Sequence, residues 1–519
     1  MERANFDRRT LLRLATASAT TLWLPRHAWS QPRIVSDPFA LGVASGSPDH
    51  ESVVLWSRLV WPDDAAAAQG AVTVRWEMAD DEQFSRIVQK GQAQASPELG
   101  HSVHVEAAGL APDRWYFYRF MAGDAVSAVG RTRTLPAPGA PMARLRVAYA
   151  SCQRWEHGYF SAYHHMREEN LDAVLFLGDY IYEFAGAADS VRIPTGGMVV
   201  TLSDYRRRYA LHRSELGLQR MHAACPWFVV WDDHEVQNDY AGTHPGTGEP
   251  TGVDFAARRA AAYQAFYEHM PVRASALTRS FAGLTSGAEM RIYQKVQVGR
   301  LATVYLLDAR QYKDAQVCGR GGFDPTKCGE WADPKRSLLG SQQESWLNGA
   351  FAQAQRGSWN VVAQQTLFGQ RDIKPGAGER LLNDGWDGYP AARQRLLDSV
   401  SKNDLRQFVM LGGDVHENWV GNVKADYANP ASPSLGAEFC GTSITSRANA
   451  RSRPAEALAE NPHFVYANNE RRGYGVVEFT PERVQTTLRG VDDVTKPDTK
   501  IGTLAKFSVR AGTPTVERE

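Results

Sequence analysis

The sequence lacks an excess of charge of either sign, an apolar run long enough to cross a membrane, and an internal repeat. Its 58 Lys and Arg residues balance 58 Asp and Glu residues over 519 positions. Overall charge therefore argues against capture of nucleic acid or of an anionic membrane, and no nucleic-acid partner is expected. Without a fixed-period repeat, solenoid and propeller folds are excluded. A hydrophobic content of 43% is enough to bury the cores of two domains.

The first thirty residues resemble an export signal. Arg8 and Arg9 precede a mildly apolar run from Leu14 to Leu24, and Ala28-Trp29-Ser30 forms a small-x-small cleavage pattern. The run is well short of the ~20 residues that a spanning helix needs. We predict a twin-arginine signal peptide over residues 1–30, recognition by the Tat translocase, and a periplasmic or secreted mature protein. Tat export moves folded proteins, which suits an enzyme that acquires a metal before export.

Two of the five cysteines bracket a Gly-rich loop. Cys318 and Cys328 stand close enough in sequence for an oxidising compartment to join them. Two free thiols or a zinc-binding pair are the alternatives, although no nearby His or further Cys completes a zinc set. Cys225 and Cys440 lie in apolar surroundings, where we expect them to be inert core residues.

Two kinds of pattern divide the chain into domains. Within residues 37–134, short runs in which residue character alternates at period two are separated by turn residues. This pattern predicts an all-β domain like a fibronectin or immunoglobulin sandwich. The stretch Leu110–Arg119 resembles the late corner of such a sandwich, where a Tyr hydroxyl returns to upstream backbone. A Pro-rich linker follows, and strands then alternate with helices over residues 142–490. Residues 491–519 are interpreted as a C-terminal tail, loosely held from Lys496 onward.

Six apolar runs in the α/β region end at polar residues. Short Val-, Leu- and aromatic-rich runs predict buried strands in βαβ units, and ligands gather at the carboxyl ends of such strands. The runs are Leu145–Ala150, Ala173–Leu177, Trp227–Trp231, Leu301–Leu307, Trp359–Ala363 and Gln407–Leu411. The polar residues that follow them are therefore predicted to converge on one site.

The residues at these strand ends are suited to binding metal. Asp179 follows Gly178 at a strand tip, and Tyr182 can reach the same point; a carboxylate can bridge two metals and a phenolate favours ferric iron. Capping by Asp179 and core packing by Tyr182 are the alternatives. Asp233 is a candidate oxygen ligand, with His234 beside it as a general acid.

Another such pair closes the sixth run. Asp414 and His416 are two residues apart and, in extended chain, would project to the same side. Both could therefore meet metals there.

These motifs resemble the PhoD family of alkaline phosphatases and phosphodiesterases, within the metallophosphoesterase superfamily. The resemblance covers Phe39 to about Leu488. It is carried by Phe39–Gly46, Val53–Trp56, Ser151-Cys152-Gln153, Trp231–Glu235, Asp308–Tyr312 and Gly413–His416. Relative to the wider superfamily, Cys152 replaces an aspartate, Asp233 an asparagine, Gln364 or Gln365 a histidine, and Asp414 a histidine.

The resemblance implies a four-layer α/β/β/α sandwich behind the N-terminal β domain, and a pair of unlike metals, Fe³⁺ and Ca²⁺. The iron ligands it implies are Cys152, Asp179, Tyr182 and His416. Asp233 and Asp414 would hold calcium, with Asp179 as the bridge. Gln365 and Asn238 are candidates for a metal ligand or for a residue supporting one.

The resemblance also implies hydrolysis of phosphate esters by a metal-bound hydroxide or oxide that attacks in line, in an enzyme that scavenges phosphate. Arg310 could bind a phosphoryl oxygen or could form a local ion pair. An alternative function is a phospholipase D acting on phospholipid headgroups, favoured if Trp386, Tyr389 and Trp419 form an apolar rim. A third hypothesis is a binding module that works through its β domain. The sequence leaves the substrate, the oligomeric state and the metals loaded open.

Overall fold

The computed structural model describes residues 37–61, 70–246, 252–278, 289–319 and 321–519. The predicted signal peptide lies outside these residues. Two compact units make up the chain: the first comprises Met1–Ala137, Val200–Phe228 and Ala256–Arg291, and the second comprises Pro138–Val199, Val229–Phe255 and Ile292–Glu519. The break at Ala137 falls within the predicted linker, but two segments of the predicted 142–490 domain group with the first unit.

The first unit contains the predicted β domain, built from antiparallel strands. One group comprises β1 (Val43–Gly46), β2 (Ser52–Arg58) and β5 (Ser102–Ala108). The other comprises β3 (Val72–Ala79), β4 (Ile87–Ala95), β6 (Trp115–Ala122), β7 (Ala125–Val126) and β8 (Gly130–Arg133). Inward residues of both groups, among them Leu55, Val74 and Tyr118, form one apolar core. The unit also holds α4 (Leu202–Arg213), α5 (Leu216–Ala224), α7 (Ser275–Thr278) and nearly all of α6 (Phe255–His269).

The tyrosine corner predicted within Leu110–Arg119 is present, and Tyr116 forms it. The Ala111 N–H donates to the Tyr116 hydroxyl at 3.0 Å, and that hydroxyl donates to the Ala111 carbonyl at 3.3 Å. The side chain thus closes the turn that leads into β6.

The second unit is built on two sheets. One contains, in spatial order, β24 (Glu517–Arg518), β23 (Ile501–Arg510), β22 (Arg483–Val491), β21 (Gly473–Phe479), β9 (Leu145–Ala150) and β10 (Ala173–Phe176). The other contains β12 (Gln294–Val298), β13 (Ala302–Leu306), β15 (Trp359–Ala363), β17 (Phe408–Gly412), β19 (Ser434–Cys440), β18 (Asn418–Lys424) and β20 (Phe464–Asn468). Strands β9 and β10 pair in parallel, as do β13, β15, β17 and β19.

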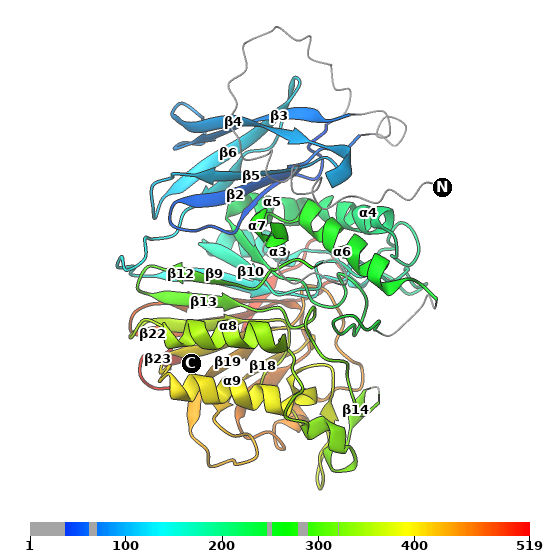
Figure 1. Cartoon of the computed structure of the whole chain (residues 1–519), viewed down its shortest axis with the longest axis vertical. Helices are drawn as coiled ribbons and strands as arrows, with labels where there is room; N and C mark the ends of the chain where they lie inside the picture. Colours follow the sequence, from blue (N-terminus) through cyan, green and yellow to red (C-terminus); the bar gives the residue numbers. More distant parts are fainter. Residues whose placement is uncertain (1–36, 62–69, 247–251, 279–288, 320) are drawn as a thin grey trace. The chain divides into compact units, whose positions relative to one another are not determined.

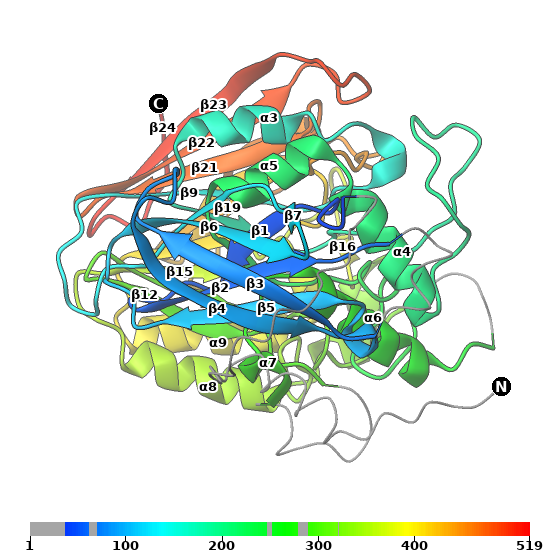
Figure 2. The same cartoon turned by 90° about the horizontal axis from the view of Figure 1, so that it is seen from above.

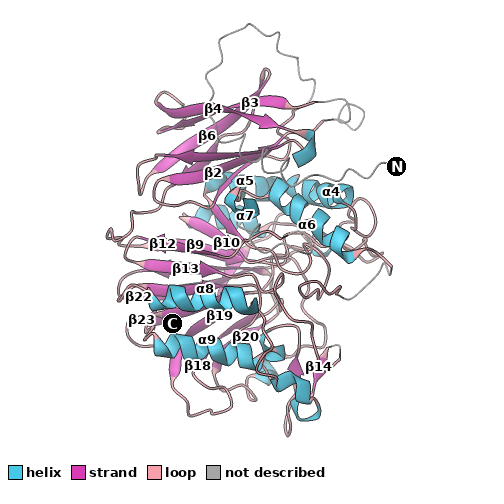
Figure 3. Ribbon diagram, in the orientation of Figure 1, coloured by secondary structure: helices cyan, strands magenta, loops and turns pink. Residues whose placement is uncertain are grey.

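The two sheets pack face to face, with helices on their outer faces. Trp359 of β15 meets Phe479 of β21, and Phe439 of β19 meets Phe507 of β23, each pair with ring centroids 6.4 Å apart. Helices α8 (Gly340–Ala352) and α9 (Pro390–Lys402) share a core with β13, β15 and β17 (Figure 1). The short helix α3 (Ala162–Met166) packs against β21 in the other sheet (Figure 2). This order of layers, also clear in Figure 3, confirms the predicted fold class.

The expectation of a loosely held tail was wrong. Residues Ile501–Arg510 form β23, which pairs with β22 along nearly its whole length. Burial of Phe507 and Val509 in that strand supplies the apolar contacts that hold it. Within the described parts of the chain, no helix is both long and apolar enough to span a membrane.

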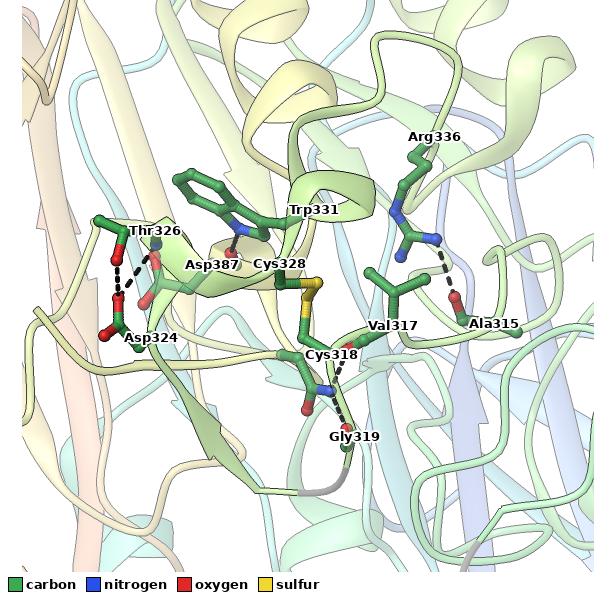
Figure 4. The surroundings of a disulfide bond; sticks show 11 residues. Ala315, Val317, Cys318, Gly319, Asp324, Thr326, Cys328, Trp331, Arg336 and Asp387 are labelled. Carbon is green, nitrogen blue, oxygen red and sulfur yellow. Dashed lines mark hydrogen bonds between the residues drawn. A yellow bond between two sulfur atoms is a disulfide. The ribbon is translucent and has the colours of Figure 1, made fainter.

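Cys318 and Cys328 form a disulfide, which resolves the alternatives left open by the sequence. Their Cα atoms are 5.7 Å apart (Figure 4). Cys225 and Cys440 are buried, as expected of core residues.

Candidate metal centre

The polar residues after the six strands converge on one region of the second unit. Just after β9, the Cys152 N–H donates to the carbonyl of Gly178, which follows β10, at 3.1 Å. The Gly413 N–H beyond β17 donates to the Gln365 carbonyl beyond β15 at 2.8 Å. Between the sheets, the Ile444 N–H donates to the Ser151 carbonyl at 3.0 Å. The carboxyl ends of strands from both sheets therefore lie next to one another.

Four of the predicted ligands have a left-handed backbone. The φ angles are 60° at Cys152, 59° at Asp179, 67° at Asp414 and 58° at His416. This conformation costs a residue with a side chain about 1–2 kcal/mol, and such strain gathers at functional sites. It turns the chain sharply at the strand end and places the side chain at the junction.

Gly178 makes one of these turns possible. Its φ is 114°, and a Cβ there would lie 2.4 Å from the Asp232 Cβ. Only glycine fits, because the chain before Asp179 passes directly against the chain after β11 (Trp227–Val229).

The first ligand cluster combines sulfur, oxygen and nitrogen donors. Ligand atoms of Cys152, Asp179 and His416 all lie within 4.8 Å of one another. The Tyr182 hydroxyl donates to Asp179 at 2.7 Å and lies 3.2 Å from His416 Nε2, and Ser446 donates to that hydroxyl at 2.8 Å. The structure thus brings together all four residues predicted to hold iron.

The His416 ring is oriented by its other nitrogen. Nδ1 lies 2.9 Å from the Arg447 carbonyl, which can only accept, so Nδ1 carries the proton. Burial lowers the His416 pKa to about 3, and the ring is neutral. Its Nε2 lone pair therefore faces Tyr182, the orientation that a metal ligand requires.

The next clusters consist mainly of carboxylates. Asp233 gathers with Asp179 and His234 on one side, and with Asp232 and Asp414 on another. Asp414 and His416 do not lie in the extended chain that was expected of them. Both residues are left-handed rather than extended, so Asp414 joins the carboxylates while His416 joins Cys152.

The centre holds more buried negative charge than its own cations neutralise. Burial raises the pKa of Asp179 and Asp232 well above the carboxyl range and that of Asp414 to about 6. Burial likewise raises the pKa of the Cys152 thiol, and the Asp179 charge adds to the effect. A bound cation would reverse these shifts, because it favours the deprotonated ligand.

The donor set fits the two expected metals. Thiol, phenol, carboxylate and imidazole suit iron, and carboxylates alone suit calcium.

The His234 ring is bonded to a glutamate that the sequence did not point to. Its Nδ1 lies 2.7 Å from a Glu183 carboxylate oxygen. Burial acts to lower the His234 pKa, but Glu183, Asp179 and Asp233 together raise it well above the usual value. Glu183 also accepts the Asn238 backbone N–H at 2.8 Å, which places the predicted Asn238 beside the centre. A lone glutamate in a loop carries no sequence signal for this role.

Arg310 lies in an ion-pair network, the second of its two predicted roles. The guanidinium bonds the Asp232 carboxylate, meets Asp384 at 2.7 Å and approaches Asp233 at 3.7 Å. The side chain is only 2% exposed. Its neighbour Asp308 does not supply the ion pair; that carboxylate instead accepts backbone N–H groups, including that of Arg310 at 3.0 Å.

Gln365 joins strand ends and does not aim at the ligand clusters. Its amide nitrogen donates to the carbonyls of Trp231 and Leu307 at 2.9 and 2.8 Å, and its oxygen accepts the Ala309 N–H at 3.1 Å. Of the two roles considered for it, support of the ligand-bearing strands fits these contacts.

Further acidic residues belong to the centre but were not predicted to. Glu235 accepts the backbone N–H groups of Asp179 and Asp232 at 3.1 and 2.8 Å, and so ties two strand ends together. Asp239 and Asp384 form a fourth cluster with Asp233. Asp384 follows none of the six apolar runs read from the sequence, so only the fold places it here.

The aromatic residues considered for a lipid-binding rim are core residues. Trp386, Tyr389 and Trp419 are each no more than 1% exposed. Trp386 and Tyr389 belong to the core beneath α8 and α9, and Trp419 packs on Phe464.

Comparisons with known proteins identify the family of this chain. The family model described as "PhoD-like phosphatase" matches residues 147–488, and the model of its N-terminal domain matches residues 26–136. The chain is 44% identical over 487 residues to alkaline phosphatase D of Bacillus subtilis (strain 168), covering 92% of this chain and 81% of that protein. A solved structure, "Structure of PhoD", superposes with a TM-score of 0.87 and 43% identity, covering 94% of this chain and 93% of that one.

Proposed function

The chain belongs to the PhoD-like phosphatase family, and we propose that this phosphatase is an exported, metal-dependent hydrolase of phosphate monoesters and diesters. The family resemblance read from its motifs is confirmed, and so is its activity as a phosphoric ester hydrolase. The observation that carries the finer proposal is the group of ligand clusters linked through Asp179 and Asp233. Shared carboxylates are what a site for adjacent cations requires.

The residues divide between the two expected metals. Cys152, Asp179, Tyr182 and His416 would hold Fe³⁺, and Asp233 and Asp414 would hold Ca²⁺, with Asp179 between them. When bound, these ions would neutralise charge developing on the phosphoryl oxygens and would activate the attacking water.

The chain itself supplies the acid. His234, whose Nδ1 is held by Glu183, is placed to give a proton to the departing alkoxide when its ring is protonated. Tyr182 lies against the His234 ring at a centroid distance of 4.0 Å and limits its rotation. Arg310 holds Asp232 and Asp233 in position through ion pairs rather than binding substrate.

Metal content and model substrates test this proposal. Purified protein is expected to contain iron and calcium and to release p-nitrophenol from p-nitrophenyl phosphate and from bis(p-nitrophenyl) phosphate. Cys152→Ser should lower the iron content, whereas Cys440→Ser, which changes another buried thiol outside the clusters, should not. Full activity after removal of all metal would overturn the proposal.

Export is supported by the Arg8-Arg9 signal pattern. We expect the double variant R8K/R9K to remain in the cytoplasm in a bacterial host with an active twin-arginine pathway. Its appearance outside the cytoplasm in normal amount would count against this route.

The phospholipase D alternative has lost its motivating feature, since the proposed aromatic rim is buried. Choline release from phosphatidylcholine vesicles, compared with hydrolysis of bis(p-nitrophenyl) phosphate, distinguishes the two activities.

A further inference from the structure

The disulfide lies beside the acidic part of the metal centre. Asn383 donates from its side-chain nitrogen to the carbonyls of Val317 and Gly319, at 2.6 and 2.5 Å. These two residues flank Cys318 on either side, as Figure 4 shows. The side-chain amide of Asn383 therefore holds the backbone on both sides of the disulfide-bonded Cys318.

The residue after Asn383 belongs to the centre. Asp384 accepts from Arg310 at 2.9 Å, from Lys313 at 2.6 Å and from Gln316 at 2.7 Å. Burial opposes its ionisation, but Arg310 and Lys313 hold the Asp384 pKa below its usual range. Through Arg310 this carboxylate is linked to Asp232 and Asp233, and it shares a ligand cluster with Asp233.

All of these contacts come from one short stretch of chain. Residues 310–316 bond Asp384, and the backbone at Val317 and Gly319 bonds Asn383. The covalent bond fixes the end of this stretch, where Cys318 has a left-handed φ of 70°. On the other side of the bond, Trp331 donates to the Asp387 carbonyl at 2.6 Å, so both arms of the disulfide hold the turn from Asn383 to Asp387 (Figure 4).

We propose that the Cys318–Cys328 disulfide, acting through Asn383, positions Asp384 so that the carboxylate side of the centre reaches full calcium affinity only once the two thiols are oxidised. This inference rests on the proposed function. In forming the bond, the thiols lose two protons and two electrons to a disulfide oxidant such as oxidised glutathione, whose S–S bond becomes two thiols. A chain folded in a reducing cytoplasm would thus gain calcium affinity after export.

The effect should be specific to calcium. Asp384 shares a cluster with Asp233 and Asp239, whereas the cluster of Cys152, Asp179 and His416 contains neither Asp384 nor Arg310. Partners that orient a metal ligand typically change metal affinity by about 10–100-fold. We therefore expect a loss of about tenfold or more in calcium affinity, with the iron content unchanged.

Calcium titration of the full-length mature protein, loaded with iron and stripped of calcium, tests the inference. Wild type, C318A/C328A and N383A are compared by isothermal titration, with iron measured in the same samples by elemental analysis. Both variants should need about tenfold more calcium for half-saturation. The matched control is K327A, which alters an exposed residue inside the same loop, ion-paired with the partly exposed Asp324, and should titrate like wild type.

The outcomes separate the two proposals. Equal calcium affinity in wild type and both variants overturns the role of the disulfide, as does a parallel loss of iron and calcium, which would indicate general destabilisation. If C318A/C328A does not fold, N383A decides, because it keeps the disulfide. If oxidised wild type binds no calcium at all, the metal assignment of the proposed function fails instead.

Discussion

Replacing Arg310 by glutamine is expected to destabilise the protein and to change how its activity depends on pH. The buried guanidinium lies among three carboxylates; it is bonded to the buried Asp232 and the partly buried Asp384, and lies 3.7 Å from the buried Asp233. Removing one partner of a buried pair costs about 3–5 kcal/mol, because the remaining charge is left uncompensated. Lys313 still meets Asp384, so the value should fall toward the lower end of that range.

The conservative variant Arg310→Lys should lose less. A single ammonium group keeps the charge but cannot bond Asp232 and Asp384 together as the planar fork does. We expect a loss of about 2 kcal/mol, the value of one hydrogen bond to a charged group.

Chemical denaturation of the metal-free protein measures these losses without the contribution of bound ions. The control is Arg395→Gln, because Arg395 also makes two charged hydrogen bonds, both to Glu344, at a partly exposed surface, at 2.8 and 2.7 Å. A surface pair contributes about 1 kcal/mol or less.

The pH profile gives an independent readout. Burial raises the Asp414 pKa to about 6, and Arg310 opposes that rise; burial also acts against Asp233, whose pKa Arg310 keeps low. Without the guanidinium, both carboxylates should take up protons at higher pH in the metal-free site. Protons should then compete with the metal at higher pH, so the acidic limb of kcat/KM moves upward. An Arg310→Gln variant with wild-type stability and pH limb, but a raised KM, would refute the ion-pair role and favour direct phosphate binding.

Two further predictions concern other parts of the fold. His104 is buried with Nε2 2.9 and 3.0 Å from the Tyr267 and Met270 carbonyls, and burial lowers its pKa from 6.5 to about 4. Because the unfolded chain binds the proton more readily, the free energy of unfolding falls by about 3 kcal/mol as the pH falls from 6.5 to 4. Urea denaturation at both ends of this range should show a smaller loss in His104→Gln. An equal loss in the variant would contradict the assignment. Gly178→Ala should abolish soluble, active protein, because the added Cβ would lie 2.4 Å from the Asp232 Cβ. Gly357→Ala, at a φ of 77° with no heavy atom within 4 Å of the added Cβ, should cost only about 1 kcal/mol of stability. Phosphatase assays and soluble yield compare the two variants, and an active G178A would contradict this account of the turn.

The strands could be predicted closely because their signals are local. Two of the six runs, Leu145–Ala150 and Trp359–Ala363, coincide with β9 and β15. Each is a short apolar stretch that ends where polar or turn residues begin, and both properties depend only on neighbouring residues. Nothing local says that these two strands belong to different sheets, since that depends on which apolar faces pack together.

The supporting residues of the centre were harder to predict than its ligands. Cys152, Asp179 and Asp233 stand at strand ends, where position and chemistry point the same way. Glu183 and Asp384 lie in loops, and their roles arise only when those loops fold back to meet His234 and Arg310.

The sequence by itself determined which residues stand at the ends of buried strands and what chemistry they offer, because β-strand preference and donor type are properties of a few adjacent residues. Tertiary structure alone decided the partners. It placed Asp414 among carboxylates and His416 beside Cys152, turned Arg310 toward carboxylates, and placed Asn383, the neighbour of Asp384, against the disulfide loop. The reason is physical: ion pairs and metal clusters require atoms within a few ångströms, and for residues this distant in sequence only the packing of the two sheets sets those distances.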